Sequence, residues 1–185
     1  MTPKLLAALF GCSIAAVSCG GDDEATAACE APSCPIDYAG LDLATPSVSF
    51  ANDVFPLFRR SCGLSSVCHG SQSSSAAGLY LGPKKSDTTT VIDVALYQQV
   101  IDGIANVPSK TAPAMDLVEP ADPSQSFLML KMDGCHNAAG LACTAQPKAK
   151  SGEPCGDSMP QGSGVLCAED RDVVRRWIAQ GAKID

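Results

Sequence analysis

The chain has 185 residues, with 13 Lys and Arg against 20 Asp and Glu, for a net charge of −7. Such an acidic chain has no basic surface to neutralise phosphates, so we expect no nucleic-acid partner. Hydrophobic residues make up 45% of the sequence, which is enough for a folded core and argues against wholesale disorder. The ten cysteines are the most unusual feature of the composition.

The first residues resemble the export signal of a bacterial lipoprotein. An apolar run from Leu5 to Val17 follows Lys4; it is too short to span a bilayer and is typical of a signal-peptide core. Small residues precede Cys19, and a polar stretch rich in Gly and Asp follows it, as in a lipobox. The resemblance implies a signal peptide over residues 1–18 and a lipid on Cys19. An ordinary secretory signal cut nearby is the alternative.

Both signals would deliver the chain to an oxidising space, where disulfides persist. The lipoprotein signal further implies a protein anchored by its N-terminal lipid to a bacterial membrane, which we expect to be the outer membrane on its periplasmic face. No later run reaches 18 apolar residues, so the sequence predicts no further membrane span.

If Cys12 leaves with the signal peptide and Cys19 carries the lipid, eight cysteines remain. They are Cys29, Cys34, Cys62, Cys68, Cys135, Cys143, Cys155 and Cys167. Their proximity along the chain suggests the local disulfides 29–34, 62–68, 135–143 and 155–167, although spacing alone does not determine connectivity.

Residues 19–47 are predicted to form a flexible tether, because this segment is rich in Gly, Ala, Asp, Glu and Pro and shows no helical or strand period. The folded domain is then expected over residues 48–185. Its first helix should run from about Ser49 to Cys62, with a start near Asp53 or a kink at Pro56. The helical apolar stripe consists of Phe50, Val54, Leu57 and Phe58.

Three further helices are predicted along the domain. The first covers residues 87–103, with Val94, Tyr97, Ile101 and Ile104 on its apolar side. The second is short, starts at the Asp122-Pro123 cap and ends near Met132. The third covers residues 168–180, with acidic residues at its start, Gly181 after its end, and Val174, Trp177 and Ile178 on its buried face.

The segments between these helices are expected to be loops. Residues 134–164 are dense in Gly, Pro, Ser and Cys, and so long a loop in a compact domain is normally functional or stapled by disulfides. Lys84-Lys85 and Arg175-Arg176 are expected to be exposed to solvent. No segment shows a convincing strand alternation, so the sequence predicts an all-α domain with long loops.

One pair of residues indicates cofactor chemistry. Cys68-His69 follows the first predicted helix and matches the second half of the Cys-x-x-Cys-His haem-attachment motif. In that motif, thiols add to the haem vinyl groups and place the adjacent imidazole beneath the iron. A methionine thioether on the opposite side raises the reduction potential, because soft sulfur favours Fe(II). Met159, which is followed by Pro160 in a loop, is the candidate for that second ligand.

Several motifs in the same order resemble the c-type cytochrome domains of exported bacterial proteins. They are Phe50-Ala51-Asn52-Asp53-Val54-Phe55-Pro56-Leu57-Phe58, Cys68-His69-Gly70, Gly78-Leu79-Tyr80-Leu81, Pro120-Ala121-Asp122-Pro123-Ser124-Gln125-Ser126, Met159-Pro160 and Trp177-Ile178-Ala179-Gln180-Gly181-Ala182.

The resemblance implies an all-α, cytochrome c-like helical domain with long disulfide-stapled loops and one haem c. It further implies thioether links at Cys62 and Cys68 and iron ligation by His69 and Met159. Such a protein would pass single electrons between redox protein partners and would be an electron carrier rather than an enzyme.

The spacing of the cysteines departs from the family pattern. Five residues separate Cys62 from Cys68, and Ser65 occupies the position where the first cysteine of the motif belongs. Three interpretations follow: haem held by both cysteines through an enlarged loop, haem held by Cys68 alone, or a disulfide between the two cysteines and no haem.

Other sites are less well supported by the sequence. Cys135-His136 repeats the dipeptide, but no partner thiol lies nearby, so we do not expect haem there. There is no Gly-rich phosphate loop, no pair of zinc knuckles, no His-Glu-x-x-His sequence and no nucleophile elbow. The alternative function is a haem-free lipoprotein, stabilised by four disulfides, that keeps the cytochrome fold as a binding or structural module.

Overall fold

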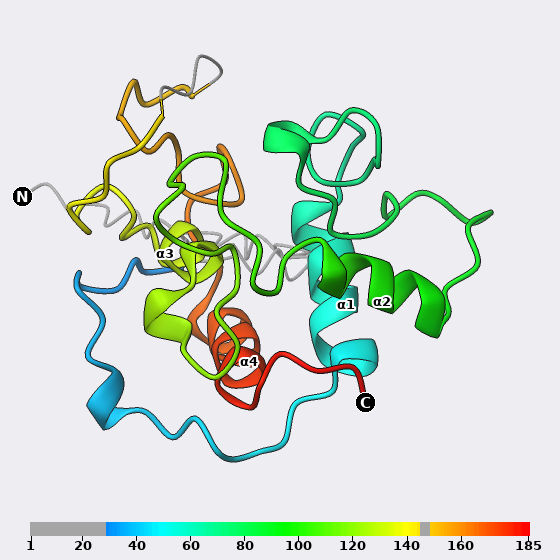
Figure 1. Cartoon of the computed structure of the whole chain (residues 1–185), viewed down its shortest axis with the longest axis horizontal. Coiled ribbons are helices and arrows are strands. Elements are labelled where there is room, and N and C mark those ends of the chain that lie inside the picture. Colours follow the sequence, from blue (N-terminus) through cyan, green and yellow to red (C-terminus); the bar gives the residue numbers. More distant parts are fainter. Residues whose placement is uncertain (1–28, 145–148) are drawn as a thin grey trace, which may run out of the picture.

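The structure, a computed structural model, describes residues 29–144 and 149–185. Within these ranges the chain is mostly helical and contains no β-strand, only two isolated bridges. Its α-helices are α1 (Phe55–Leu57), α2 (Val94–Asp102), α3 (Phe127–Asp133) and α4 (Ala168–Ala179) (Figure 1). Short 3-10 or π-type helices are η1 (Tyr38–Gly40), η2 (Phe50–Val54), η3 (Phe58–Cys62), η4 (Ala76–Gly78) and η5 (Pro123–Gln125). The structure thus confirms two predictions, a mostly helical domain and the presence of disulfides.

The predicted first helix is confirmed as one continuous helical run formed by η2, α1 and η3. The Ser49 hydroxyl caps its start by accepting from the Asn52 amide at 3.0 Å. Pro56 lies in the first turn of α1, between the two π-type segments, and the chain continues through it. The run ends at Cys62, directly before Gly63.

The core forms where this helical run packs against α4. The Trp177 ring lies 5.3 Å from the Phe50 ring and meets the Phe58 ring edge-on at 6.3 Å, measured between centroids. The indole N–H donates to the Lys183 carbonyl at 2.9 Å, so the polar atom of this buried side chain is satisfied. The apolar faces predicted for both helices are buried together, as the sequence pattern indicates.

The helix predicted over residues 87–103 begins later, at Val94. The Asp87 carboxylate instead accepts from the amides of Thr89 and Thr90 and holds a turn there. Asp93 then caps α2 by accepting from the Leu96 amide at 2.9 Å. As a result Val94 lies on the first turn with 65% of its surface exposed, rather than in the predicted apolar stripe.

The helix predicted from Asp122 to Met132 is divided into two. The Asp122 carboxylate accepts from the amides of Ser124 and Gln125 and closes η5, as the capping pattern predicts. Ser126 is extended, so α3 begins separately at Phe127 and ends at Asp133. Gly134, the next residue, has the left-handed conformation that commonly follows a helix. The last helix, α4, begins at Ala168 as predicted.

Residues 29–48 form a strap that lies against the domain, and this corrects the predicted flexible tether for the part that the structure describes. The Gln180 amide donates to the carbonyls of Leu43, Ala44 and Pro46, and Arg171 donates to the Glu30 carbonyl at 3.1 Å. The strap runs beside α4 before it joins the first helical run (Figure 1). Arg171 of α4, Gln180 directly after it and the disulfides of Cys29 and Cys34 therefore hold the strap in place.

The disulfides differ from the local pairs that sequence proximity suggests. Cys29 is joined to Cys167, Cys34 to Cys135, and Cys143 to Cys155, while Cys62 and Cys68 are unpaired. All six cysteines expected to staple loops are paired, but none has the predicted partner. The strap lies against the residues that follow α3 and those that precede α4, so cysteines more than 100 residues apart in sequence become neighbours.

The disulfide connectivity can be tested by peptide mapping under non-reducing conditions. We expect three linked peptide pairs, 29–167, 34–135 and 143–155, because the fold brings these thiols together. Recovery of a peptide joining Cys29 to Cys34, or Cys135 to Cys143, would contradict the arrangement of the strap.

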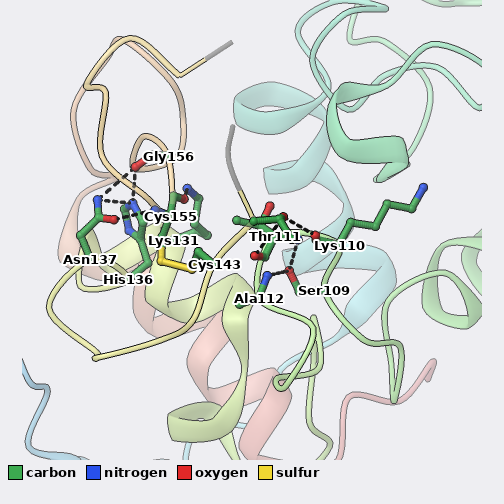
Figure 2. The surroundings of a disulfide bond; sticks show 11 residues. Ser109, Lys110, Thr111, Ala112, Lys131, His136, Asn137, Cys143, Cys155 and Gly156 are labelled. Atoms are coloured by element: carbon green, nitrogen blue, oxygen red, sulfur yellow. Dashed lines mark hydrogen bonds between the residues drawn. A yellow bond between two sulfur atoms is a disulfide. The ribbon is translucent and has the colours of Figure 1, made fainter. Parts of the chain in front are cut away.

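The long loop after α3 is closed by the Cys143–Cys155 disulfide and held by several hydrogen bonds (Figure 2). The Gly156 carbonyl accepts from His136 Nε2 at 2.8 Å and from the side-chain Nδ2 of Asn137 at 3.1 Å. The side-chain Oδ1 of Asn137 in turn accepts from the backbone amide of Cys155 at 3.0 Å. Because the Cys143–Cys155 bond closes the same loop, the described part of residues 134–164 is stapled, as expected.

Stability should fall in mild acid, because His136 is buried in this loop. Burial lowers the pKa of His136 below its ordinary value, so the unfolded chain takes up a proton first as the pH drops through about 6.5. Stability is therefore lost as the pH falls below that value. We expect the urea midpoint of the wild type to decrease between about pH 7.5 and about pH 5.5. His136→Gln, which cannot be protonated, should show a smaller decrease; equal decreases would exclude this role.

The most buried charged group of the described chain is one that the sequence analysis did not identify. Asp133, at the end of α3, is fully buried and accepts from Arg175 at 2.7 Å, while Arg171 lies 3.3 Å away. Burial raises the pKa of Asp133, and the two arginines oppose that effect. Arg175 is therefore buried rather than exposed to solvent, which corrects the expectation for this residue.

Candidate functional site

The Cys-His segment forms a tight loop at the end of η3. The His69 amide donates to the Cys62 carbonyl at 3.1 Å, and the amides of Cys68 and Gly70 both donate to the Ser65 carbonyl at 3.2 Å. A Cβ atom at Gly70 would lie 2.9 Å from the carbonyl oxygens of Gly63 and Ser65. Only glycine fits at that position, which explains why glycine follows the Cys-His pair.

His69 is held in the form that can bind a metal. Its side chain is buried, and Nδ1 lies 3.0 Å from the Leu79 carbonyl oxygen. Because a carbonyl can only accept, Nδ1 carries the proton and Nε2 keeps its lone pair. Burial, and to a lesser extent the charge of Lys131, lowers the pKa of His69, which keeps the imidazole neutral. The backbone of the predicted Gly78–Leu81 segment thus fixes the tautomer, as partners of metal-binding histidines commonly do.

The two unpaired cysteines have different surroundings. Cys62 is in the hydrophobic core, and burial, together with the neighbouring Cys68, raises the pKa of its thiol to about 12. Cys68 is half-buried, and its sulfur accepts a hydrogen bond from the Ser65 hydroxyl at 3.1 Å. Between them, Leu64 and Val67 expose most of their apolar side chains. The loop therefore presents one accessible thiol and an apolar surface beside His69.

Met159 lies in a different part of the fold. It is half-buried in the loop before α4, and its amide donates to the Lys131 carbonyl at 2.9 Å. The Lys131 ammonium donates to the Cys155 carbonyl at 2.8 Å and also acts on His69 through its charge.

The best-formed cavities in the described residues are away from this loop. One of about 340 Å³ lies between the strap and the segment after α3, with the Cys34–Cys135 disulfide in its wall. Another of about 100 Å³ lies between the strap and α4. Neither is lined by Cys62, Cys68, His69 or Met159, so cavity size and cofactor chemistry point to different places. Neither cavity is lined by a histidine or by an unpaired cysteine, the side chains that haem attachment requires.

The structure thus brings Cys62, Cys68 and His69 together after η3, and Met159 lies in the loop before α4, next to Lys131. Residues 29–144 and 149–185 contain no group of three His, Cys, Asp or Glu side chains suited to a metal ion, and no helix within them could cross a membrane. The three disulfides are compatible with an exported protein. The expected signal peptide and the lipidated Cys19 lie outside the described residues.

Comparison with protein-family models, with curated proteins and with solved structures finds no significant match to this chain.

Proposed function

We propose that this protein is a c-type cytochrome-like electron carrier. One observation carries the proposal: among the described cysteines, the two left unpaired are those that precede His69 in the haem-attachment loop. In an oxidising compartment, unpaired thiols are uncommon unless they have another role. Six described cysteines stabilise the fold as disulfides, and the remaining two lie beside a neutral imidazole whose Nε2 is available.

The residues of the loop fit a covalently attached haem. His69 would be the proximal ligand, oriented by its bond to Leu79, and Met159 would be the distal ligand. The exposed side chains of Leu64 and Val67 supply apolar surface beside Cys68, which a flat macrocycle could cover. When bound, the haem would supply a one-electron couple, which a thioether ligand shifts toward Fe(II).

The role would be transfer of single electrons rather than turnover of a substrate. With His69 and Met159 both bound to the iron, no coordination position is left open for a substrate. A lipid on Cys19 would hold the domain at the periplasmic face of the outer membrane, where it exchanges electrons with redox proteins. The acidic net charge agrees with protein partners rather than nucleic acid.

The alternative is a haem-free lipoprotein that uses the fold as a binding or structural module. The strap favours it, because disulfides closing loops of 101 and 138 residues stabilise a fold without any cofactor. The four bridges expected of this alternative are reduced to three in the structure, since Cys62 and Cys68 are unpaired.

The test is the absorbance spectrum of the protein exported from a host with an active cytochrome c maturation system. We expect a red protein whose reduced pyridine adduct shows a c-type spectrum. His69→Ala should abolish the six-coordinate spectrum, because it removes the proximal nitrogen. His136→Gln is the matched control, as His136 also follows a cysteine, and it should leave the spectrum unchanged. A colourless wild type would exclude the proposal and favour the haem-free alternative.

Met159→Ala provides a separate prediction for the distal ligand. Loss of the thioether should lower the reduction potential and open a coordination position, because sulfur stabilises Fe(II). Met115→Ala, a half-buried methionine beside the larger cavity, is the control. If potentiometry finds the same shift in reduction potential for both variants, or no shift for Met159→Ala, Met159 is not the distal ligand.

A further inference from the structure

The position of Cys62 is unsuited to a thioether link. The residue ends η3, keeps only 8% of its surface exposed and belongs to the hydrophobic core with Phe58 and Leu81. A haem bonded to this sulfur would have to enter space filled by core side chains, at the packing density of a protein interior.

The position that normally carries the first thioether lies next to Cys68 and holds a serine. In the Cys-x-x-Cys-His pattern this is the residue three before the second cysteine, which here is Ser65. The turn from Ser65 to Cys68 is closed by the Cys68 amide, and the Ser65 hydroxyl lies 3.1 Å from the Cys68 sulfur. The loop therefore keeps the geometry that brings these two positions together, but only one of them has a thiol.

The disulfides of the other cysteines account for the odd number of thiols that a single thioether at Cys68 would leave. If Cys68 alone carries haem, an odd number of cysteines remains, which is unusual for an exported protein. The structure pairs six of them and places the odd one, Cys62, inside the core. Burial protects a thiol from oxidation and exchange, so an unpaired Cys62 can persist there.

We infer that the haem is attached through one thioether, at Cys68, and that Cys62 stays a free thiol of the core. This inference rests on the proposed function. In the attachment, the Cys68 S–H bond breaks and a C–S bond forms to one carbon of a haem vinyl group. The proton goes to the other vinyl carbon, the π bond is consumed, and the addition needs no external oxidant or reductant. The second vinyl group would stay unmodified, because the position that supplies the other thiol in the motif holds Ser65.

Thiol counting on the wild-type protein tests this inference. In the haem-free chain exported from a host without the maturation system, an aromatic disulfide reagent should modify Cys68 in the native state. Cys62 should react only after unfolding. In the red protein from the maturation host, no thiol should react in the native state and one, Cys62, should be alkylated by iodoacetamide after unfolding. Mass spectrometry of the peptide covering residues 61–84 locates both modifications.

The outcomes separate this inference from the proposed function. A red protein with covalent haem and no thiol after unfolding indicates two thioethers and overturns the inference alone. Haem that acidified acetone extracts shows no covalent link, which also overturns it while leaving haem binding intact. A colourless protein, or a Cys62–Cys68 disulfide, overturns both.

Two variants give a matched comparison at the same loop. Cys62→Ala should retain covalent haem at the wild-type ratio of haem to protein, whereas Cys68→Ala should lose the covalent link entirely. The reverse result would assign the link to Cys62. If Cys62→Ala fails to fold, the thiol count on the wild type still decides the question.

Discussion

Asp133→Ala is expected to lower the free energy of unfolding by about 3–5 kcal/mol, because it leaves two buried arginines without their shared counter-ion. Asp133 is fully buried and lies within 3.3 Å of the side-chain nitrogens of both Arg171 and Arg175. Arg171 also holds the strap at the Glu30 carbonyl, and Arg175 lies over the Tyr38 ring at 5.9 Å. Loss of the carboxylate should therefore loosen the strap as well as the contact between α3 and α4.

Chemical denaturation of the wild type and of two variants measures this effect. Asp170→Ala is the matched control, because Asp170 also pairs with an arginine, Arg60, but both partners are partly exposed, at 30% and 44%. Exposed pairs contribute about 0–1 kcal/mol, so this variant should unfold close to the wild type. A similar loss of unfolding free energy in the two variants would show that the buried cluster stabilises the fold no more than the exposed pair.

Trp177→Ala should destabilise the fold by about 3–5 kcal/mol, as large-to-small substitutions of buried aromatic residues do. The indole is 1% exposed and joins α4 to the first helical run through Phe50 and Phe58. The substitution leaves a cavity between the two segments and removes the hydrogen bond to Lys183. The loop that carries His69 begins where this helical run ends, so the loss of stability should extend to the candidate site.

Trp177→Phe is the control that separates packing from the hydrogen bond. It keeps an aromatic ring in the core and loses only the N–H donor and part of the volume, so we expect a cost of about 1–2 kcal/mol. Thermal unfolding followed by far-ultraviolet circular dichroism measures both variants. An alanine variant as stable as the phenylalanine variant would contradict the assigned role of the aromatic contact.

The candidate site was predictable where its chemistry depends on adjacent residues. The Cys68-His69 pair and Gly70 are recognisable in the sequence, and the structure adds the reason for the glycine, a contact of 2.9 Å with two carbonyl oxygens. The bond from His69 to Leu79 was not predictable in detail, because it depends on how residues 79–81 fold back over the loop. The binding of an iron by His69 and Met159 stays a prediction.

Local patterns also determined most helices of this protein. The stripe from Phe50 to Phe58 and the Asp122-Pro123 cap indicate helical segments that the structure contains, since periodicity and capping act within a few residues. The start of α2 was displaced because Asp87 and Asp93 are both good caps, and only the turn at Thr89 and Thr90 decides between them.

Only the tertiary structure decided the disulfides, the strap and the buried charges. Cys29 and Cys34 are close in sequence, yet each pairs with a distant cysteine, because the strap lies against the end of α3 and the start of α4. Asp133 and Arg175 resemble ordinary surface charges until two helices bring them together. The sequence by itself thus determined a mostly helical protein with ten cysteines and a Cys-His pair. Long-range packing determined which thiols became disulfides and left Cys62 and Cys68 unpaired, because contact between distant segments is a property of the fold and not of spacing.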